Sequence, residues 1–570
     1  MNESRISRDT GRLRYLQTLY GDANAAELES GIDSLIAKYA SKAAMSGKPK
    51  RLTESDVALI TYGDTLNESN TPPLQVLHRF HREYLAGIFD LIHILPFHPY
   101  SSDDGFSVID YKAIREDLGT WEDVESLSKD CRIMADAVIN HMSSQSRWFK
   151  QYLAGNPEFA DFFIDYDPHE DLSAVVRPRT SPLLTCYKDA SGSDRHIWTT
   201  FSADQVDLNF RNPSVLLAVI DVLFFLISKG ASLLRLDAVT FLWKEPGTAC
   251  ANLERTHALI KIMRSAVSAL RDDIVAITET NVPHRENVAY FGNGYDEAHM
   301  VYNFALPPLI AHGLIQGNGR HLSQWAKGLS LPSDEVCFFN FSASHDGVGV
   351  RPVEEILNAD ELQQLVDATV AAKGEVSSRT MTDGKQRPYE LNCTFLDLVA
   401  KAGEPEAVTV SRFVAAQAIV LAMPGVPAIY IQSLLGTRND FDLMEETGRA
   451  RSINRSRHDY SAIEGKLADT DGLEGKIFSA LTRLIRIRRE QTAFNPYAEF
   501  KVIDLGDSVF ALLRGGKADG QRICSIINLD GKNVDVQIEA DVAGIDLLTN
   551  KPITAGKHTL PPYAVRWLSS

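Results

Sequence analysis

The sequence has no long apolar run, few cysteines and no excess of positive charge. Its longest apolar stretch, residues 216–227, contains Asp221 and is too short to cross a bilayer. The N-terminus, Met1-Asn-Glu-Ser-Arg5, is polar, so no signal peptide is expected. The six cysteines form no C-x-x-C pair and are expected to be reduced thiols. These absences predict a cytoplasmic protein with no membrane partner.

The net negative charge argues against nucleic acid as a partner. Lys and Arg number 58 against 75 Asp and Glu, which gives a net charge of −17 at pH 7. Such an acidic surface disfavours nucleic acid, and a phosphate site would have to be built from local cations. His78 and His81 lie three apart on a helical stretch and are interpreted as a surface face, not as metal ligands. We expect no metal and no cofactor, and the sequence leaves the oligomeric state open.

Eight short apolar runs alternate with helical stretches and predict an α/β fold, a closed (β/α)8 TIM barrel over residues 54–495. They lack the alternation of half-exposed strands, as is typical of parallel strands covered on both faces. An N-terminal helical segment, residues 1–53, precedes the barrel. The expected strands are residues 57–62, 91–97, 133–140, 233–239, 274–279, 300–304, 336–341 and 426–431.

Two connections are too long for ordinary loops and predict inserted subdomains. One, residues 142–206, follows the third strand, and the other, residues 347–405, follows the seventh. Both should overhang the active face, because both follow the carboxyl ends of strands. From residue 496 to 570 short strands separated by turn residues predict a C-terminal antiparallel β-sandwich.

Carboxylates stand at the ends of three of the predicted strands, namely Asp237, Glu279 and Asp346. Glycoside chemistry needs two carboxyl groups across the scissile bond, and a retaining mechanism places them about 5–5.5 Å apart. Arg235 lies on the same side of its strand as Asp237 and favours an ionised nucleophile there. Burial could raise the pKa of Glu279 and keep it protonated as a general acid.

Four segments in this order resemble the motifs of the α-amylase superfamily, glycoside hydrolase family 13. They are Asp136-Ala-Val-Ile-Asn-His141, Arg235-Leu-Asp-Ala-Val239, Glu279-Thr-Asn281 and Phe341-Ser-Ala-Ser-His-Asp346. The resemblance implies that Asp237 forms a covalent β-glucosyl enzyme and that Glu279 is the acid/base. It further implies that Asp346 stabilises the transition state and that the glucosyl ring is held by His141, Arg235 and His345.

Further segments look like the sucrose phosphorylase group: Leu95-Pro-Phe-His-Pro-Tyr-Ser-Ser-Asp-Asp-Gly-Phe106, Arg177-Pro-Arg179, Trp198-Thr-Thr-Phe-Ser-Ala-Asp-Gln205 and Ser452-Ile-Asn-Arg455. That likeness implies a pocket for one glucosyl unit, in which inorganic phosphate replaces water as the acceptor and gives α-glucose 1-phosphate. Arg179 would be the phosphate cation, since a guanidinium binds phosphate in a bidentate way. The implied substrate-binding residues are Asp103 and Arg455 as a clamp on sugar hydroxyls, Gln205, and Phe106, Phe201 and Phe241 as apolar walls.

One segment departs from the sucrose phosphorylase pattern. Arg387-Pro-Tyr-Glu-Leu-Asn392 stands where that group carries an Asp-Leu-Tyr-Gln-Val-Asn-like segment. With Lys244-Glu-Pro-Gly247 and Leu434-Leu-Gly-Thr-Arg-Asn-Asp440, it looks most like the 2-O-α-glucosylglycerate phosphorylases. The small-molecule partners would be that glucoside and phosphate, with Arg387 or Arg438 on the glycerate carboxylate and Tyr389 and Glu390 beside it.

Several alternatives stay open at this stage. Arg387 and Glu390 could instead pair with each other at the surface. The leaving group could be fructose, fructose 6-phosphate or glycerol, as in phosphorylases of sucrose, sucrose 6′-phosphate or glucosylglycerol. The same site could serve an α-glucosidase, a transglucosidase or, as a non-enzyme, a sugar-binding protein.

Overall fold

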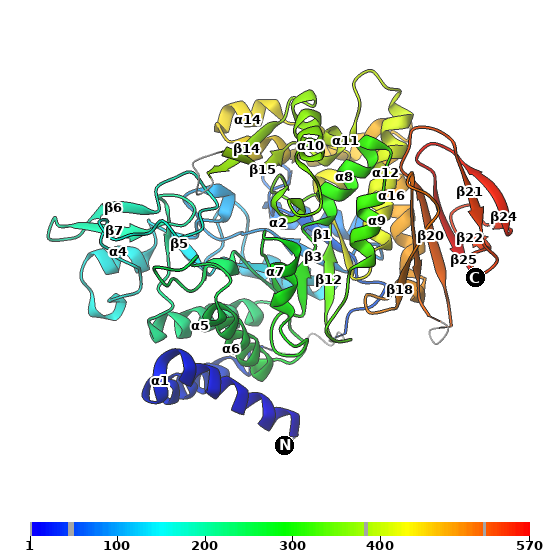
Figure 1. The fold of residues 1–570 in the computed structure, drawn as a ribbon. Helices are drawn as coiled ribbons and strands as arrows, with labels where there is room; N and C mark the ends of the chain where they lie inside the picture. The colour runs from blue at the N-terminus through cyan, green and yellow to red at the C-terminus, as the bar shows by residue number, and fades with distance from the viewer. Residues whose placement is uncertain (1–2, 44–50, 381–385, 517–519) are drawn as a thin grey trace.

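A closed barrel of eight parallel strands forms the centre of the molecule (Figure 1). The computed structural model describes residues 3–43, 51–380, 386–516 and 520–570. Around the barrel the strands are β1 (Ala58–Thr61), β16 (Val426–Tyr430), β12 (Cys337–Asn340), β11 (Met300–Tyr302), β10 (Val275–Thr278), β9 (Ala231–Leu236), β4 (Arg132–Ala137) and β3 (Leu91–Ile94). Each overlaps one of the eight predicted runs, so the predicted (β/α)8 fold is confirmed.

The helices outside the barrel follow ordinary sequence signals, as α5 (Pro213–Ser228) illustrates. Asn212 caps its first turn by accepting a hydrogen bond from the Ser214 amide, and Pro213 suits the first helical position. The helix is apolar nearly all round because it lies between the barrel and a further helix. Among the residues that the structure describes, no helix combines the length and apolarity that a membrane crossing requires.

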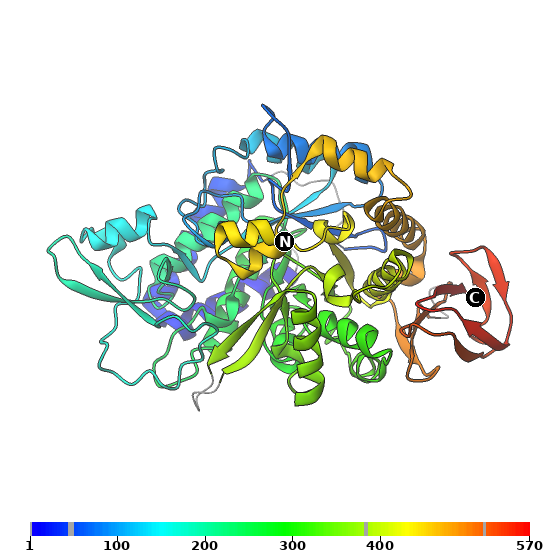
Figure 2. The same cartoon turned by 90° about the horizontal axis from the view of Figure 1, so that it is seen from above.

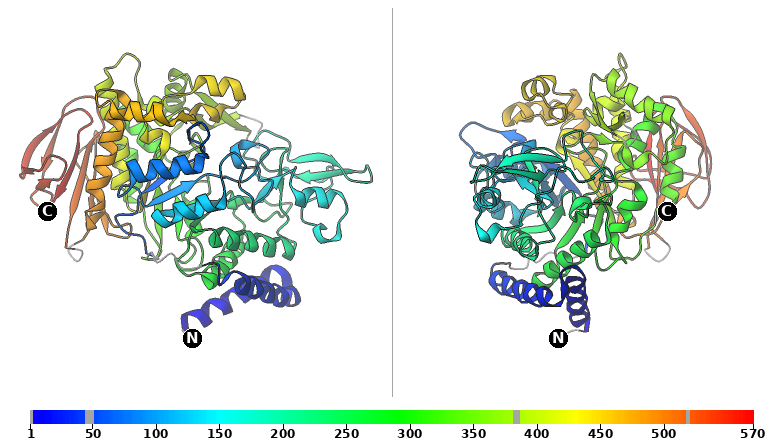
Figure 3. Two further views of the ribbon diagram at one scale, coloured as in Figure 1. Left: turned by 180° about the vertical axis from the view of Figure 1, so that it is seen from behind. Right: turned by 60° about the vertical axis from the view of Figure 1, so that its left-hand side comes forward.

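The N-terminal segment forms α1 (Glu3–Tyr39), which kinks at Gly21, where φ is 77°. It lies on the outside of α5 and α6 (Glu254–Leu270), as the blue helix in Figures 1 and 3 shows. The Tyr20 hydroxyl donates to the Phe210 carbonyl at 2.8 Å and ties α1 to the barrel. Residues 3–39 are therefore helical in two arms, whereas the limits predicted for this segment, 1–53, stay a prediction.

Each predicted insertion contains strands of its own. After β4, strand β5 (His141–Ser143) pairs with β8 (Gln205–Asp207), and the hairpin β6 (Leu184–Lys188)–β7 (Asp194–Trp198) projects to one side in Figure 2. After β12, three strands form a sheet beside α10 (Ala359–Ala371): β13 (Val348–Gly349), β15 (Gln386–Asn392) and β14 (Glu375–Thr380). The limits predicted for these subdomains, 142–206 and 347–405, stay predictions, as do the other domain limits.

The last part of the chain is antiparallel, as expected. A six-stranded sheet consists of β18 (Phe500–Ile503), β19 (Val509–Arg514), β20 (Ile523–Asn528), β25 (Val565–Ser569), β22 (Gly544–Asp546) and β23 (Lys551–Ile553), and a second sheet pairs β21 (Val534–Ile538) with β24 (Gly556–Leu560). Strand β19 shows how the two layers form. Phe510 and Leu512 join the main core with the barrel, whereas Ala511 and Leu513 pack into a separate core with Val536 of β21.

Candidate active site

A pocket at the carboxyl ends of the barrel strands brings most of the predicted site residues together. The side chains come from strand ends and from both insertions. The lining residues are Asp103, Phe106, His141, Arg179, Phe201, Gln205, Arg235, Asp237, Ala238, Glu279, Asn281, His345, Asp346, Tyr389 and Arg451.

Asp237 follows β9 and lies on a buried network of charges. Arg235 Nη1 is 2.7 Å from Asp237 Oδ1, and the same guanidinium also bonds to Asp136. His93 Nε2 holds the other oxygen of Asp136 at 2.7 Å. On balance the pKa of Asp237 is raised above its ordinary value, because burial outweighs the opposing charge of Arg235. Because a direct guanidinium contact favours the charged form, we infer that Asp237 is the ionised member of the pair.

Glu279 occupies the corresponding position on the neighbouring strand. Leu236 of β9 pairs with Thr278 of β10, so Asp237 and Glu279 follow side by side. Burial raises the pKa of Glu279 to about 7, with a smaller contribution from the charges of Asp237 and Asp346 and against the opposing charge of Arg235. Its Oε2 accepts a hydrogen bond from the Ala238 amide at 3.1 Å. Within the described ranges no cation forms a salt bridge with Glu279, which suits a proton donor at neutral pH.

The backbone at Ala238 is held in an unusual conformation. Its φ is 51°, in the left-handed region that a residue with a Cβ rarely adopts. This turn directs the Ala238 amide toward Glu279, directly after the carboxylate of Asp237. Strain of this kind persists only where the surroundings impose it, and here it links the two carboxyl groups.

Asp346 follows the end of β12 and, unlike Glu279, lies beside two arginines. Arg451 Nη1 lies 2.6 Å from Asp346 Oδ1, and Arg455 Nη2 is 3.8 Å from the same oxygen. Burial alone would raise the pKa of Asp346, but the charges of Arg451 and Arg455 outweigh burial and bring the pKa well below its ordinary value. Asp346 is therefore ionised at neutral pH.

Aromatic rings close the pocket around these carboxyl groups. Phe106 stacks on His345 with ring centroids 4.7 Å apart, and Phe201 contacts the His141 ring at 5.1 Å. Burial lowers the pKa of His345 to about 3, so its imidazole is neutral. Gln205 Nε2 donates to the Phe106 carbonyl at 3.0 Å. The result is a site lined mainly by polar and charged side chains, in which the rings of Phe106 and Phe201 supply the apolar part of the wall.

The loop that carries Asp103 is strained and tightly anchored. Asp103, Asp104 and Gly105 all have positive φ, at 52°, 47° and 111°. Arg455 donates from Nη1 to Asp104 at 2.5 Å and from Nε to the His345 carbonyl at 2.8 Å. Arg455 does not line the pocket, so it fixes the loop from behind while Asp103 faces the cavity. The proposed clamp on sugar hydroxyls thus has only Asp103 at the surface of the pocket.

A substitution at Gly105 tests how far this anchoring matters. A Cβ there would lie 2.7 Å from the Pro96 carbonyl oxygen, whereas at Gly87, also at positive φ, it would meet open space. We expect Gly105→Ala to be less stable than Gly87→Ala by about 1–3 kcal/mol, the usual cost of overpacking. It should also lower kcat/KM for the glucosyl donor. Urea melts and steady-state kinetics measure both, and equal behaviour of the two variants would contradict the anchoring role.

Several predicted residues lie outside the pocket lining. Phe241 packs edge-on behind Phe201 at 5.6 Å. Arg438 is half-exposed and pairs with Asp397. Arg387 is exposed on β15, toward the tip of the β14–β15 hairpin. The structure therefore does not bring Arg387 or Arg438 to the cavity.

Glu390 fits neither hypothesis from the sequence, that it lies beside the acceptor or that it pairs with Arg387 at the surface. It is buried and pairs in a bidentate way with Arg451, not with Arg387. Its neighbour Tyr389 does line the pocket. Arg451 was missed by sequence reasoning, although it directly precedes the segment 452–455 that had been singled out.

Arg179, by contrast, lies at the pocket with its charge available. Its guanidinium lies over the Tyr389 ring, 5.8 Å from the centroid. In the part of the chain that the structure describes, no carboxylate forms a salt bridge with it. An unpaired guanidinium beside the carboxylates is suited to an anionic acceptor.

Lys244, which the sequence singled out only as part of the segment 244–247, is a buried lysine behind the pocket. Lys244 Nζ lies 2.6 Å from Asp207 Oδ2 and 2.8 Å from Asn140 Oδ1. Burial lowers the pKa of Lys244, while Asp207 opposes the shift. Asp207 belongs to β8 and pairs with His141 of β5, so this ion pair holds the strand that positions His141.

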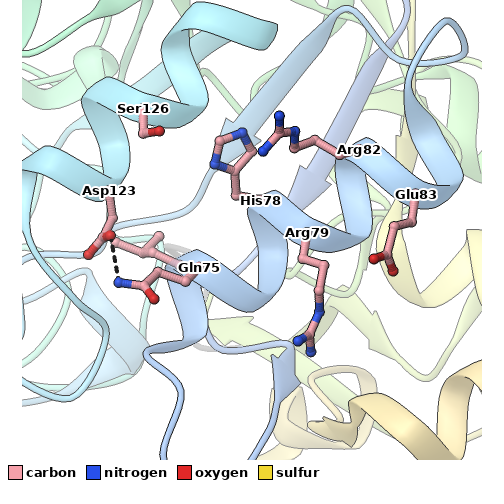
Figure 4. Close-up of a pocket in the computed structure, with 8 residues that line it drawn as sticks. Gln75, His78, Arg79, Arg82, Glu83, Asp123 and Ser126 are labelled. Atoms are coloured by element: carbon pink, nitrogen blue, oxygen red, sulfur yellow. Dashed lines mark hydrogen bonds between the residues drawn. The ribbon is translucent and has the colours of Figure 1, made fainter.

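A second hollow lies far from this chemistry, on α2 (Pro73–Phe80) and α3 (Trp121–Asp130) (Figure 4). His78 lines it and bonds to Asp130 at 2.7 Å. His81 is instead buried and bonds to the Phe89 carbonyl. The prediction of a shared surface face was therefore wrong for His81, because the helix widens into a π-turn at residues 81–85.

The barrel and its paired carboxyl groups define the class of glycoside-processing barrel enzymes. A model of the α-amylase catalytic domain matches residues 81–321. The chain is 43% identical to glucosylglycerate phosphorylase of Escherichia coli K12 over 97% of this chain and 99% of that one. It belongs to the α-amylase family and, within it, to the glucosylglycerate phosphorylase group. The resemblance predicted from the motifs is confirmed.

The chain is also similar, at lower identity, to phosphorylases with other names. The chain is 30% identical to sucrose phosphorylase of Agrobacterium vitis, over 80% of this chain and 92% of that one. The crystal structure of sucrose 6F-phosphate phosphorylase from Thermoanaerobacter thermosaccharolyticum superimposes with a TM-score of 0.74 at 25% identity, over 90% of this chain and all of that one. The fold is thus shared across phosphorylases whose names give different substrates.

Proposed function

We propose that this protein is a retaining phosphorylase that transfers a glucosyl unit from 2-O-α-D-glucosylglycerate to inorganic phosphate. The products are α-D-glucose 1-phosphate and glycerate. The near full-length match at 43% identity supports the substrate. The observation that carries the chemistry is the pairing of an arginine-bound Asp237 with a Glu279 whose pKa is raised to about 7.

In the first step an Asp237 oxygen attacks C1 of the glucosyl unit. The bond from C1 to the glycerate oxygen breaks, and Glu279 gives its proton to that oxygen. Asp237 can attack because Arg235 keeps it ionised, and Glu279 can donate because burial keeps it protonated. The product of this step is a β-linked glucosyl ester on Asp237.

In the second step phosphate replaces glycerate. Glu279, now ionised, accepts a proton from the phosphate as a phosphate oxygen attacks C1, and the ester to Asp237 breaks. Two inversions at C1 restore the α configuration. Asp346 would hold the glucosyl hydroxyls through both steps, and the aromatic walls exclude water from the ester.

Arg179 is the proposed phosphate cation, and its removal gives a clear expectation. In Arg179→Ala the KM for phosphate should rise about 10- to 100-fold, the usual cost of losing a charge-assisted hydrogen bond. Arg179→Lys should recover part of the loss, because it restores charge but not the bidentate geometry. Initial rates of glucose 1-phosphate formation at varied phosphate measure this. A phosphate KM equal to that of the parent would remove Arg179 from the acceptor site.

The leaving group is tested by a substrate panel at one phosphate concentration. Glucosylglycerate, sucrose, sucrose 6′-phosphate and glucosylglycerol differ only in what departs from C1. We expect the highest kcat/KM for glucosylglycerate, and a higher value for sucrose would favour the sucrose phosphorylase alternative. Phosphate-independent release of glucose would favour an α-glucosidase. A cytoplasmic location remains the proposal from the sequence.

A further inference from the structure

Arg451 lies between two carboxylates at the edge of the pocket, the buried Glu390 and the partly exposed Asp346. Its Nε and Nη2 donate to the two oxygens of Glu390 at 3.0 and 2.8 Å. Its Nη1 is 2.6 Å from Asp346 Oδ1. Glu390 is 1% exposed, so its charge is neutralised almost wholly by Arg451. The guanidinium plane is therefore fixed from two directions.

Some N–H groups of Arg451 remain available to donate hydrogen bonds to a ligand in the pocket. A guanidinium has five N–H groups, of which two are directed to Glu390. Nη1 is in ion-pair contact with Asp346 without a hydrogen bond to it, so the two N–H groups of Nη1 and one N–H of Nη2 have no hydrogen-bond partner among the described residues. Arg451 lines the pocket, and its side chain keeps 18% of its surface exposed there.

The chain is built to allow Glu390 this close approach. Gly347 directly follows Asp346, and a Cβ on it would lie 2.7 Å from Glu390 Cγ and 2.6 Å from the Leu391 carbonyl oxygen. Along β15, Tyr389 lies under Arg179 while Glu390 binds Arg451. One strand of the insertion thus supports two cations at the same cavity.

We propose that Arg451 is a positioning residue, fixed by Glu390, that holds Asp346 for the donor glucose and presents its remaining N–H groups to the anionic acceptor. The acceptor chemistry is an oxyanion, either of phosphate or of the glycerate carboxylate. This inference rests on the proposed function. The hold of Arg451 on Asp346, in contrast, is expected with any glucosyl donor.

Two assays separate these roles. Fluoride release from α-glucosyl fluoride reports attack by Asp237 with no acid and no anionic acceptor required, because fluoride leaves C1 unprotonated. The KM for phosphate in phosphorolysis and the KM for glycerate in the reverse reaction report the acceptor.

The variants are Glu390→Gln, which loosens Arg451, and the double variant Glu390→Gln/Arg451→Gln, which leaves no unpaired buried charge between them. Arg486→Gln, exposed on α16 (Leu473–Arg489), controls for loss of one arginine.

Glu390→Gln should raise the KM for one or both anions about ten-fold, more than it changes the rate of fluoride release by the same variant. The anion whose KM rises is the one that Arg451 binds. In the double variant, Asp346 loses its nearest counter-ion, its pKa rises, and the acid limb of the fluoride-release profile moves to higher pH. Arg486→Gln should alter neither. Fluoride-burst amplitudes give the folded, active fraction of each variant.

Unchanged KM values for both anions in Glu390→Gln would overturn the acceptor role. An unmoved acid limb in the double variant would overturn the hold on Asp346. If the parent enzyme makes no glucose 1-phosphate from any donor, the proposed function fails, yet the fluoride-release profile still decides the role at Asp346.

Discussion

Replacing Asp237 with asparagine is expected to lower kcat for phosphorolysis by about 10⁴-fold or more, the scale seen when a covalent nucleophile is removed. An amide cannot form the glucosyl ester, so the two-step route is lost. That factor corresponds to about 5 kcal/mol of transition-state stabilisation. Mass spectrometry of the enzyme mixed with α-glucosyl fluoride and quenched should show a glucosyl adduct in the parent and none in Asp237→Asn.

The variant should still fold, which keeps the result interpretable. Arg235 retains its second partner, Asp136, so no buried guanidinium is left without a carboxylate. Asp471→Asn, at an exposed position, is the matched control and should behave like the parent. A glucosyl adduct on Asp237→Asn, or a kcat near that of the parent, would assign the nucleophile elsewhere.

Replacing Glu279 with glutamine should have the second largest effect, and one that depends on the leaving group. Glycerate needs a proton to depart and fluoride does not, so turnover of glucosylglycerate should fall by about 10²–10⁴-fold, the usual worth of general acid catalysis. Fluoride release should fall far less. Burst kinetics with both donors measure the ratio, and equal losses on the two donors would exclude Glu279 as the acid.

The raised pKa of Glu279 also predicts a pH dependence. The parent should lose glucosylation of the enzyme by glucosylglycerate as pH rises through about 7, because the acid is then ionised. A pKa higher in the folded than in the unfolded state also means that the folded protein loses stability as pH rises through that value. Glu279→Gln should therefore melt at a higher temperature than the parent above about pH 7. Melting curves at several pH values test the sign.

The fold could be predicted from the sequence because its signals are local. Each barrel strand is a short apolar run buried on both faces, and each predicted run overlaps a strand of the structure. Residues such as Asn212 and Pro213 mark where helices begin. Asp237, Glu279 and Asp346 follow the ends of barrel strands. Closure of the barrel alone brings the strand ends to one face, so the meeting of these residues could be predicted.

The acceptor side could not be predicted in the same way, because its contacts join distant segments. Arg451 reaches Asp346 and Glu390 from a segment 61 or more residues away, and no spacing in the sequence encodes that approach. Lys244 reaches Asn140 across 104 residues. Arg387 was proposed because a cation stands where the sucrose phosphorylase segment carries Asp, but the structure places it at an exposed position.

The account is tested most directly by following glucosylglycerate with and without phosphate by ³¹P and ¹H NMR. We predict that glucosylglycerate is consumed only when phosphate is present, and that the first-formed product is the α anomer of glucose 1-phosphate with equimolar glycerate. Free glucose as the main product, or the β anomer of the phosphate, would contradict the two-step transfer through Asp237 to phosphate.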